Sequence, residues 1–146
     1  MNNVTVTHDV IIVHLPIETV SEANQSEHWS KKHKRHKHQK LHIDLQWQYI
    51  PKIKLPCTIR LTRISPRTLD DDNLLSAFKH IRDCIADKLF PEKTIGISKK
   101  TNLPCKISGR SDSNPNVKWL YNQEKGRFSQ EFKQGIRIEI VQRSVI

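Results

Sequence analysis

The sequence predicts an α/β (α+β) fold, with one small mixed β-sheet packed by two or more helices. Short segments that alternate apolar and polar residues indicate strands with one buried face. A longer segment with apolar residues at helical spacing indicates an amphipathic helix. Strands and helices follow one another along the chain, which favours a sheet covered by helices. The 146 residues fit a single domain, 1–146, that is long enough to bury its own core.

The first half of the chain contains two predicted strands and one predicted helix. Val10–Val13 is apolar and β-branched, which predicts a strand that could begin at Val4. The polar and basic segment from Ser26 to about Tyr49 predicts a helix in its middle. Residues 58–64 alternate apolar and basic side chains, so we expect a strand with one buried and one cationic face.

The second half contains the clearest helix. Its apolar positions lie at i, i+4, i+7 and i+11 and predict a helix from about Asp71 to Leu89. They are Leu74, Phe78, Ile81 and Ile85. Residues 91–111 carry glycines and prolines without a sustained period and are expected to form a long basic loop. Residues 117–121 and 135–141 alternate again and predict two more strands.

The charge of the chain favours a polyanionic partner. The formal net charge is +10 and the pI is about 9.7. A basic segment at 28–42 holds six Lys or Arg and no acid, and five more basic residues lie between Lys93 and Arg110. Residues 31–40 include no apolar side chain, whereas membrane-surface helices need an apolar face. The phosphate backbone of nucleic acid is therefore the expected partner.

Cysteine usage and hydropathy indicate a cytoplasmic protein. Cys57, Cys84 and Cys105 are odd in number and lack the paired spacing of zinc or redox motifs. We expect reduced thiols, as in cytoplasmic proteins. No apolar run approaches the ~20 residues of a membrane span, so no membrane partner is expected.

Three consecutive aspartates, residues 70–72, interrupt this basic chain. Such a cluster repels a polyanion unless a divalent cation neutralises it, and Mg²⁺ takes carboxylate oxygens and bridges them to phosphate. In extended backbone Asp70 and Asp72 point the same way, so both could bind one ion. Capping of the following helix is as good an explanation for one of these aspartates as a metal site, but three aspartates are more than a helix cap needs. Asp71 in place of Asp70 remains open as a ligand.

Further candidate residues lie on the predicted helix and after the basic loop. Asp72, Ser76, Lys79 and Asp83 share one helical face. Lys79 could hold a phosphate or stabilise its developing charge, or it could pair with Asp83. Asp112 alone suggests an Asx turn, and it gains interest if the fold returns it to the aspartate run.

The basic segment also contains five histidines. They lack cysteine or carboxylate companions at ligand spacing, and the lysines beside them repel a cation, which disfavours zinc. They are His28, His33, His36, His38 and His42. A phosphate-binding segment is preferred, in which Trp29 and Trp47 either anchor to the core or stack on bases.

Three segments resemble the RusA-type endodeoxyribonucleases of bacteria and their prophages. In residues 67–87 an Asp-x-Asp-Asn-Leu motif opens a helix that carries a lysine and later an aspartate. Residues 111–119 are similar to that family's third aspartate in a turn before a strand, and the likeness continues to Lys125. His28 and Trp29, with the basic run after them, resemble the corresponding region of phage members.

The resemblance implies a small homodimeric nuclease that resolves four-way (Holliday) DNA junctions in recombination and repair by Mg²⁺-dependent cleavage, with Mn²⁺ as an alternative ion and no small-molecule cofactor. Carried onto this sequence, Asp70, Asp72 and Asp112 are the metal ligands, and these three with Lys79 are the catalytic residues. In the shorter, best-known form of the family the lysine lies one helical turn nearer the aspartates, where this chain has Ser76.

Two other functions remain open at this stage. A non-catalytic nucleic-acid-binding module would use the basic segments and keep the aspartates as a helix cap. A metal-dependent nuclease of another specificity, such as an RNase, would share the site. Metal dependence separates the binding module from the two enzymes. The sequence leaves open the number of ions and the kind of branched DNA.

Overall fold

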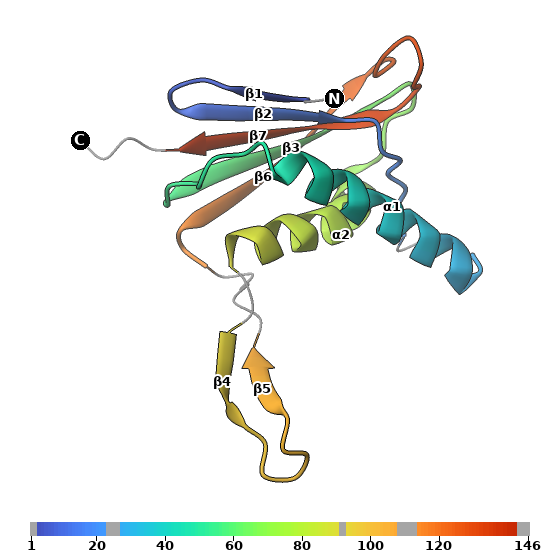
Figure 1. Ribbon diagram of the computed structural model, residues 1–146. Coiled ribbons are helices and arrows are strands. Elements are labelled where there is room, and N and C mark those ends of the chain that lie inside the picture. The colour runs from blue at the N-terminus through green and yellow to red at the C-terminus, as the bar shows by residue number, and fades with distance from the viewer. Residues whose placement is uncertain (1–2, 23–26, 91–92, 108–113, 143–146) are drawn as a thin grey trace.

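The predicted fold class is confirmed: a computed structural model of the chain has a mixed five-stranded sheet with two helices (Figure 1). It describes residues 3–22, 27–90, 93–107 and 114–142. The elements in chain order are β1 (Val4–Val6), β2 (Val10–Leu15), α1 (Trp29–Trp47), β3 (Cys57–Ser65), α2 (Asp71–Leu89), β4 (Lys93–Ile97), β5 (Pro104–Ile107), β6 (Val117–Lys125) and β7 (Gly135–Gln142).

The five-stranded sheet has the order β1-β2-β7-β3-β6. All neighbouring pairs are antiparallel except β3 and β6, which run parallel. A parallel pair needs a crossover connection, and the chain between β3 and β6 contains α2. Both helices lie on the same face of the sheet (Figure 1).

The core lies between this face and the helices. In the register, Leu61 of β3 lies beside Ile138 of β7, which lies beside Val13 of β2. These side chains are at most 2% exposed. From α2, Phe78 and Ile81 are fully buried against the same cluster. The predicted apolar stripe of α2 is thus the face that packs on the sheet, and both predicted ends of this helix are confirmed.

The interface between α1 and α2 contains an unusual histidine pair. The rings of His36 and His80 stack in parallel, with centroids 3.9 Å apart. Nε2 of His80 lies 3.1 Å from the carbonyl oxygen of His36 and 3.4 Å from Sγ of Cys84. On the other side, Nε2 of His36 lies 2.7 Å from a carboxylate oxygen of Glu22. Burial raises the pKa of the Cys84 thiol to about 11, so it is a neutral thiol at neutral pH.

An ion pair also joins the two helices: Lys88 of α2 pairs with Asp44 of α1, at 2.8 Å.

Two sequence predictions need correction. The first predicted strand is two strands, β1 and β2, which pair as a hairpin. The segment predicted as a long loop at 91–111 contains a second hairpin, β4 with β5. A bulge between Thr94 and Gly96 interrupts the alternation of this hairpin. Because the hairpin forms a sheet of its own, packing imposes no amphipathic pattern on it.

Other predictions about these elements are confirmed. Helix α1 occupies the middle of the segment from Ser26 to Tyr49, and the strands predicted at 117–121 and 135–141 are parts of β6 and β7. Cys57 and Cys84 are free thiols, and both are buried. Within the described ranges, neither helix combines the length and the apolar character that a membrane crossing requires.

The histidine pair makes stability depend on pH. Burial, and then the charge of His36, lower the pKa of His80, while the hydrogen bond to the backbone of His36 and the charges of Glu22 and Asp83 act in the opposite direction. Between this lowered pKa and the ordinary value of about 6.5, the unfolded chain binds a proton that the folded chain does not, so stability falls as pH drops below about 6.5. His80→Gln should therefore flatten the fall in melting temperature between about pH 6.5 and 5, measured by circular dichroism. The exposed His33→Gln should follow the wild type, and a His80→Gln curve parallel to it would refute the role of His80.

Candidate active site

The aspartate run lies at the start of α2. Asp70 is the N-cap residue, with extended backbone, and its side-chain oxygen accepts the N–H of Asn73 at 2.9 Å. Asp71 and Asp72 are the first two helical residues, and both are exposed. Among the described residues, nothing donates a hydrogen bond to the carboxylates of Asp71 and Asp72. One of the three acids therefore caps the helix, and the other two face solvent.

Gln123 of β6 fixes the backbone directly before this run. Its side-chain oxygen accepts the N–H of Leu69 at 2.9 Å, and its side-chain nitrogen donates to the carbonyl of Leu69 at 2.6 Å. One amide thus binds both polar groups of a single backbone residue, as a neighbouring strand would. This pairing holds the residue before Asp70 against the edge of the sheet.

A buried arginine supports the same region. Arg63 of β3 is only 6% exposed and lies beside Gln123 in the register of the sheet. Its Nε donates to the hydroxyl of Thr19 at 3.0 Å, and its Nη1 donates to the carbonyl of Arg67 at 2.6 Å. Burial lowers the pKa of Arg63. The arginine therefore joins the segment after β2 to the turn that leads to Asp70.

The cationic face predicted for β3 is corrected by this finding. Arg60 is exposed on the face without helices, but Arg63 has the parity of Ile59 and Leu61 and lies on the buried face. Burial of a guanidinium is costly unless hydrogen bonds compensate it. The two hydrogen bonds of Arg63 supply part of that compensation.

Lys79 lies on the helical face predicted for it. An open pocket of about 380 Å³ beside α2 is lined by Leu75, Ser76, Lys79, Arg82, Asp83 and, from β6, Tyr121. Lys79 is exposed, and among the residues that the structure describes none lies within ion-pairing distance of its ammonium. The alternative ion pair with Asp83 is thus not formed, and the ammonium is available to a ligand.

A cationic and aromatic cluster borders this pocket, which Arg82 and Tyr121 line. The guanidinium of Arg82 lies 5.0 Å from the ring centroid of Trp119, and its Nη1 donates to the hydroxyl of Tyr121 at 3.0 Å. Trp119 and Tyr121 belong to β6 and are half-buried. A guanidinium held over an aromatic ring presents a planar positive surface, which suits the phosphates and bases of nucleic acid.

The structure brings some of the predicted site residues together and leaves others untested. Asp70, Asp72 and Lys79 lie on the first three turns of one helix. The extended backbone from which we expected Asp70 and Asp72 to point the same way is not formed, because Asp72 is already helical. Asp112 lies outside the described residues, so its approach to this helix stays a prediction. Among the described residues, no three His, Cys, Asp or Glu side chains are arranged to hold a metal ion.

The donor set nevertheless fits Mg²⁺. This ion commonly binds through one or two carboxylates, keeps several waters and takes its remaining ligands from substrate phosphates. Asp72 offers an exposed carboxylate, and Asp70 has a second oxygen beyond the one that caps α2. The hard oxygen ligands suit Mg²⁺ or Mn²⁺ rather than zinc.

The basic segment at 28–42 is partly neutralised by its own contacts. Arg35 forms ion pairs with Glu22 at 2.9 Å and with Glu27 at 2.5 Å. Hydrogen bonding to Arg35 lowers the pKa of Glu27. Arg35 is therefore a structural residue of α1. The other basic side chains along this part of the helix are exposed, namely Lys31, Lys32, Lys34, Lys37 and Lys40.

The two tryptophans of this segment have different roles. Trp29, at the start of α1, is 72% exposed, whereas Trp47 is half-buried against the core. Of the two alternatives, anchoring applies to Trp47. Stacking on bases remains a proposal for Trp29.

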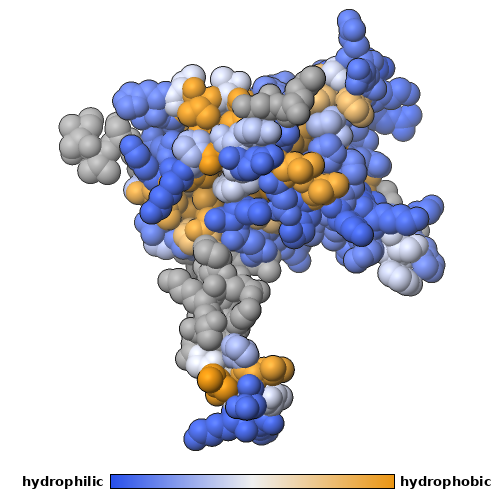
Figure 2. All heavy atoms as spheres, in the orientation of Figure 1, coloured by the Kyte–Doolittle hydropathy of each residue, from blue (hydrophilic) through white to orange (hydrophobic). Residues whose placement is uncertain are grey.

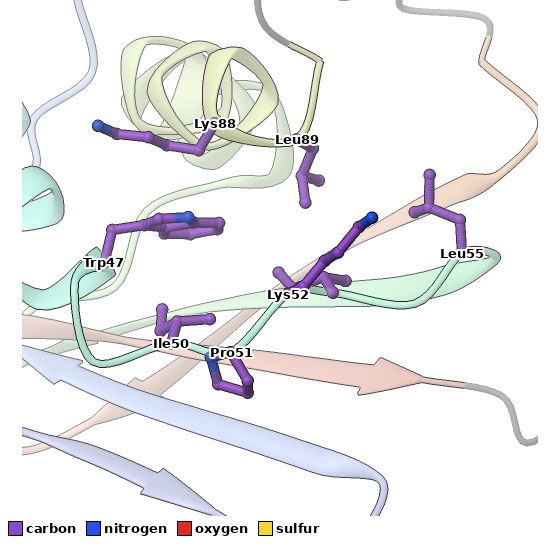
Figure 3. A pocket seen from close by; sticks show the side chains of 8 residues that line it. Trp47, Ile50, Pro51, Lys52, Leu55, Lys88 and Leu89 are labelled. Carbon is purple, nitrogen blue, oxygen red and sulfur yellow. The ribbon is translucent and has the colours of Figure 1, made fainter.

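A second pocket lies away from the aspartates, near the C-terminal end of α2 (Figure 3). Trp47 and Leu89 line it together with the turn after α1, and its charged members are Lys52 and Lys88. It contains no carboxylate, thiol or histidine. This pocket therefore offers no carboxylate ligand for a metal ion.

Sequence reasoning missed three residues that build the site. Arg63 could have been found from its parity with Ile59 and Leu61 on one strand. Gln123 contacts Leu69, and Arg82 contacts Tyr121. Both contacts join elements that are distant in sequence, so no local sequence pattern predicts them.

Comparisons with known proteins add no assignment: no family model, no curated protein and no solved structure matches the chain.

The cap at Asp70 can be separated from the charge of its carboxylate. Asp70→Ala should lower the free energy of unfolding by about 1 kcal/mol, because the N–H of Asn73 loses its acceptor. Asp70→Asn should stay within a few tenths of a kcal/mol of the wild type, because asparagine caps equally well. Urea unfolding measures both, with Asp71→Ala as the control that leaves the cap intact. Equal losses in the two Asp70 variants would show that charge, and not capping, stabilises the helix.

Proposed function

We propose that this chain is a Mg²⁺-dependent endodeoxyribonuclease that cleaves four-way DNA junctions. The observation that carries the proposal is the placement of exposed carboxylates and an exposed lysine on the first turns of one helix, beside a cationic aromatic pocket, in a chain of net charge +10. The resemblance of residues 67–87 and 111–125 to RusA-type enzymes supports the choice of DNA junctions over other phosphodiesters.

Each residue has a distinct task in the proposed reaction. Asp72 and Asp70, with Asp112 as the third proposed ligand, would hold Mg²⁺. When bound, this ion supplies an activated water and polarises the phosphate. Lys79 lies two helical turns beyond Asp72, roughly 10 Å along the axis, and its ammonium would stabilise the negative charge that develops on the phosphate.

Binding would use surfaces outside this centre. Arg82 and the aromatic residues of β6 would orient the strand beside the scissile phosphate. The exposed lysines of α1 would contact the backbone without reading sequence. A twofold homodimer would supply two such centres, as two opposed cuts in a junction require.

Incubation of the purified protein with different nucleic acids tests the proposal. A synthetic four-way junction, a linear duplex, single strands and RNA are each incubated with and without Mg²⁺, and oligomeric state is measured by light scattering. We expect cleavage of the junction only with Mg²⁺, by a dimer. Asp72→Asn should abolish cleavage and leave junction binding intact, because it removes one ligand and one negative charge that faces phosphate.

Asp87→Asn, at an exposed position about 22 Å further along α2, is the matched control and should cleave normally. Binding without cleavage under every condition would identify a nucleic-acid-binding module instead. Cleavage confined to RNA would identify a nuclease of another specificity. Near-normal cleavage by Asp72→Asn would refute the metal site at this position.

Lys79→Ala tests the role of the ammonium in the transition state. We expect the single-turnover rate at saturating protein to fall by about 100-fold or more, with less than a tenfold change in junction affinity. Lys37→Ala, at an exposed position on α1, should weaken binding slightly and leave the rate unchanged. Equal losses of rate and affinity in Lys79→Ala would mark an ordinary phosphate contact.

A further inference from the structure

The hairpin of β4 and β5 stands apart from the rest of the fold. Figure 1 shows it projecting away from the five-stranded sheet and the helices, beyond the C-terminal end of α2. Its two strands pair only with each other and form a sheet of their own. An isolated two-stranded hairpin is at best marginally stable in water. This element therefore gains from a partner that packs against it.

The tip of the hairpin is a defined turn. The N–H of Ser98 donates to the carbonyl of Leu103 at 2.9 Å, and the N–H of Asn102 donates to the carbonyl of Ser98 at 2.9 Å. Asn102 has a φ of 58°, in the left-handed region that asparagine tolerates better than most residues. These contacts close the loop of residues 99–102 and fix the positions of its neighbours.

Apolar side chains flank this turn and are exposed. Ile97 is 69% exposed and Leu103 is 63% exposed. Pro104, which is opposite Ile97 in the register, is exposed as well. Figure 2 shows orange apolar residues at the far end of the hairpin, next to blue hydrophilic ones. The hairpin thus presents an apolar end that nothing in the described chain covers.

The charge of the hairpin indicates which partner would cover it. Residues 93–107 contain four lysines and no aspartate or glutamate. Lys99 and Lys100 form half of the loop at the tip, and both are exposed. A cationic segment with an apolar end complements a polyanion that also offers apolar surface. Stacked nucleic-acid bases beneath a phosphate backbone have this combination.

We propose that the β4–β5 hairpin is a DNA-binding arm that inserts Ile97 and Leu103 between bases while Lys99 and Lys100 contact the flanking phosphates. Apolar side chains that enter the minor groove in this way partly unstack a base step and kink the duplex. The proposal rests on the proposed function for its choice of DNA as partner, and it assigns a second contact that the cleavage chemistry does not need.

The separation of the two regions fits this role. The aspartates lie at the start of α2, whose 19 residues span roughly 28 Å, and the hairpin follows the other end of that helix. One turn of B-form DNA spans about 34 Å. The arm would therefore contact the DNA about one helical turn away from the scissile phosphate.

Fluorescence of 2-aminopurine, which rises when a base is unstacked, tests the insertion. The analogue is placed in turn at each position of a four-way junction arm, and the full-length protein is added with Ca²⁺ in place of Mg²⁺. We expect a several-fold rise at one or two adjacent positions. Ile97→Ser/Leu103→Ser should abolish the rise and weaken binding by about tenfold, while cleavage with Mg²⁺ at saturating protein is retained.

Two control variants separate insertion from general effects. Val6→Ser/Leu45→Ser removes two comparably exposed apolar side chains, each 50% exposed, from other parts of the fold and should behave as the wild type. Lys99→Gln/Lys100→Gln should lower the salt dependence of binding by up to about 1.8 units of logarithmic slope, because each lost phosphate contact contributes about 0.9.

Each remaining outcome decides between the arm and the nuclease. If the wild type binds and cleaves the junction without any rise in fluorescence, or if the serine variant keeps the rise, the arm is refuted and the nuclease stands. A rise that the serine substitutions abolish, without cleavage in Mg²⁺, would support the arm and refute the nuclease. Failure to bind DNA would overturn both. Tighter binding to vesicles of equal parts phosphatidylcholine and phosphatidylserine than to DNA would replace the arm with a membrane contact.

Discussion

The buried guanidinium of Arg63 is the contact on which the region around the aspartates depends. It lies in the sheet row that ends in Gln123, and its hydrogen bonds reach both Thr19 and the carbonyl of Arg67. Gln123 then fixes Leu69, the residue before Asp70. A buried cation is expensive to desolvate, so it persists only where its hydrogen bonds are well formed. The start of α2 is consequently held by groups that tolerate little displacement, as a site that must position carboxylates requires.

The helices α1 and α2 have different roles in the proposed function. Helix α2 carries the acids at its first turn and Lys79 and Arg82 further along, so the spacing along this helix sets the distance between the proposed metal ligands and the two cations. Helix α1 has exposed lysines, whereas its Arg35 and His36 pair with Glu22 and Arg35 also pairs with Glu27. The exposed lysines of α1 thus contribute to the net charge of +10, and the aspartates at the start of α2 are an exposed acidic group in this basic chain.

The sequence predicted the elements whose side chains bury a regular stripe. Helix α2 was predicted at both ends because Phe78 and Ile81 repeat with the helical period and Pro91 follows. The sequence did not predict the β4–β5 hairpin. A bulge interrupts the alternation of apolar and polar residues in this hairpin, and its apolar residue Ile97 is exposed, so no regular buried stripe marks the strands. For the site, local spacing was sufficient to place Asp72 and Lys79 on one helix. Contacts such as Gln123 with Leu69 join residues 54 positions apart and become visible only in the fold.

The central claim is that the start of α2 holds a divalent ion, and Mn²⁺ in a ¹⁵N-labelled sample tests it most directly. Mn²⁺ broadens the amide signals of nearby residues in a two-dimensional NMR spectrum. The account predicts broadening centred on Asp70, Asp72 and Asn73, reaching Gln123 and reversed by excess Mg²⁺. Broadening centred on the His36 and His80 pair, or none at the start of α2, would contradict it.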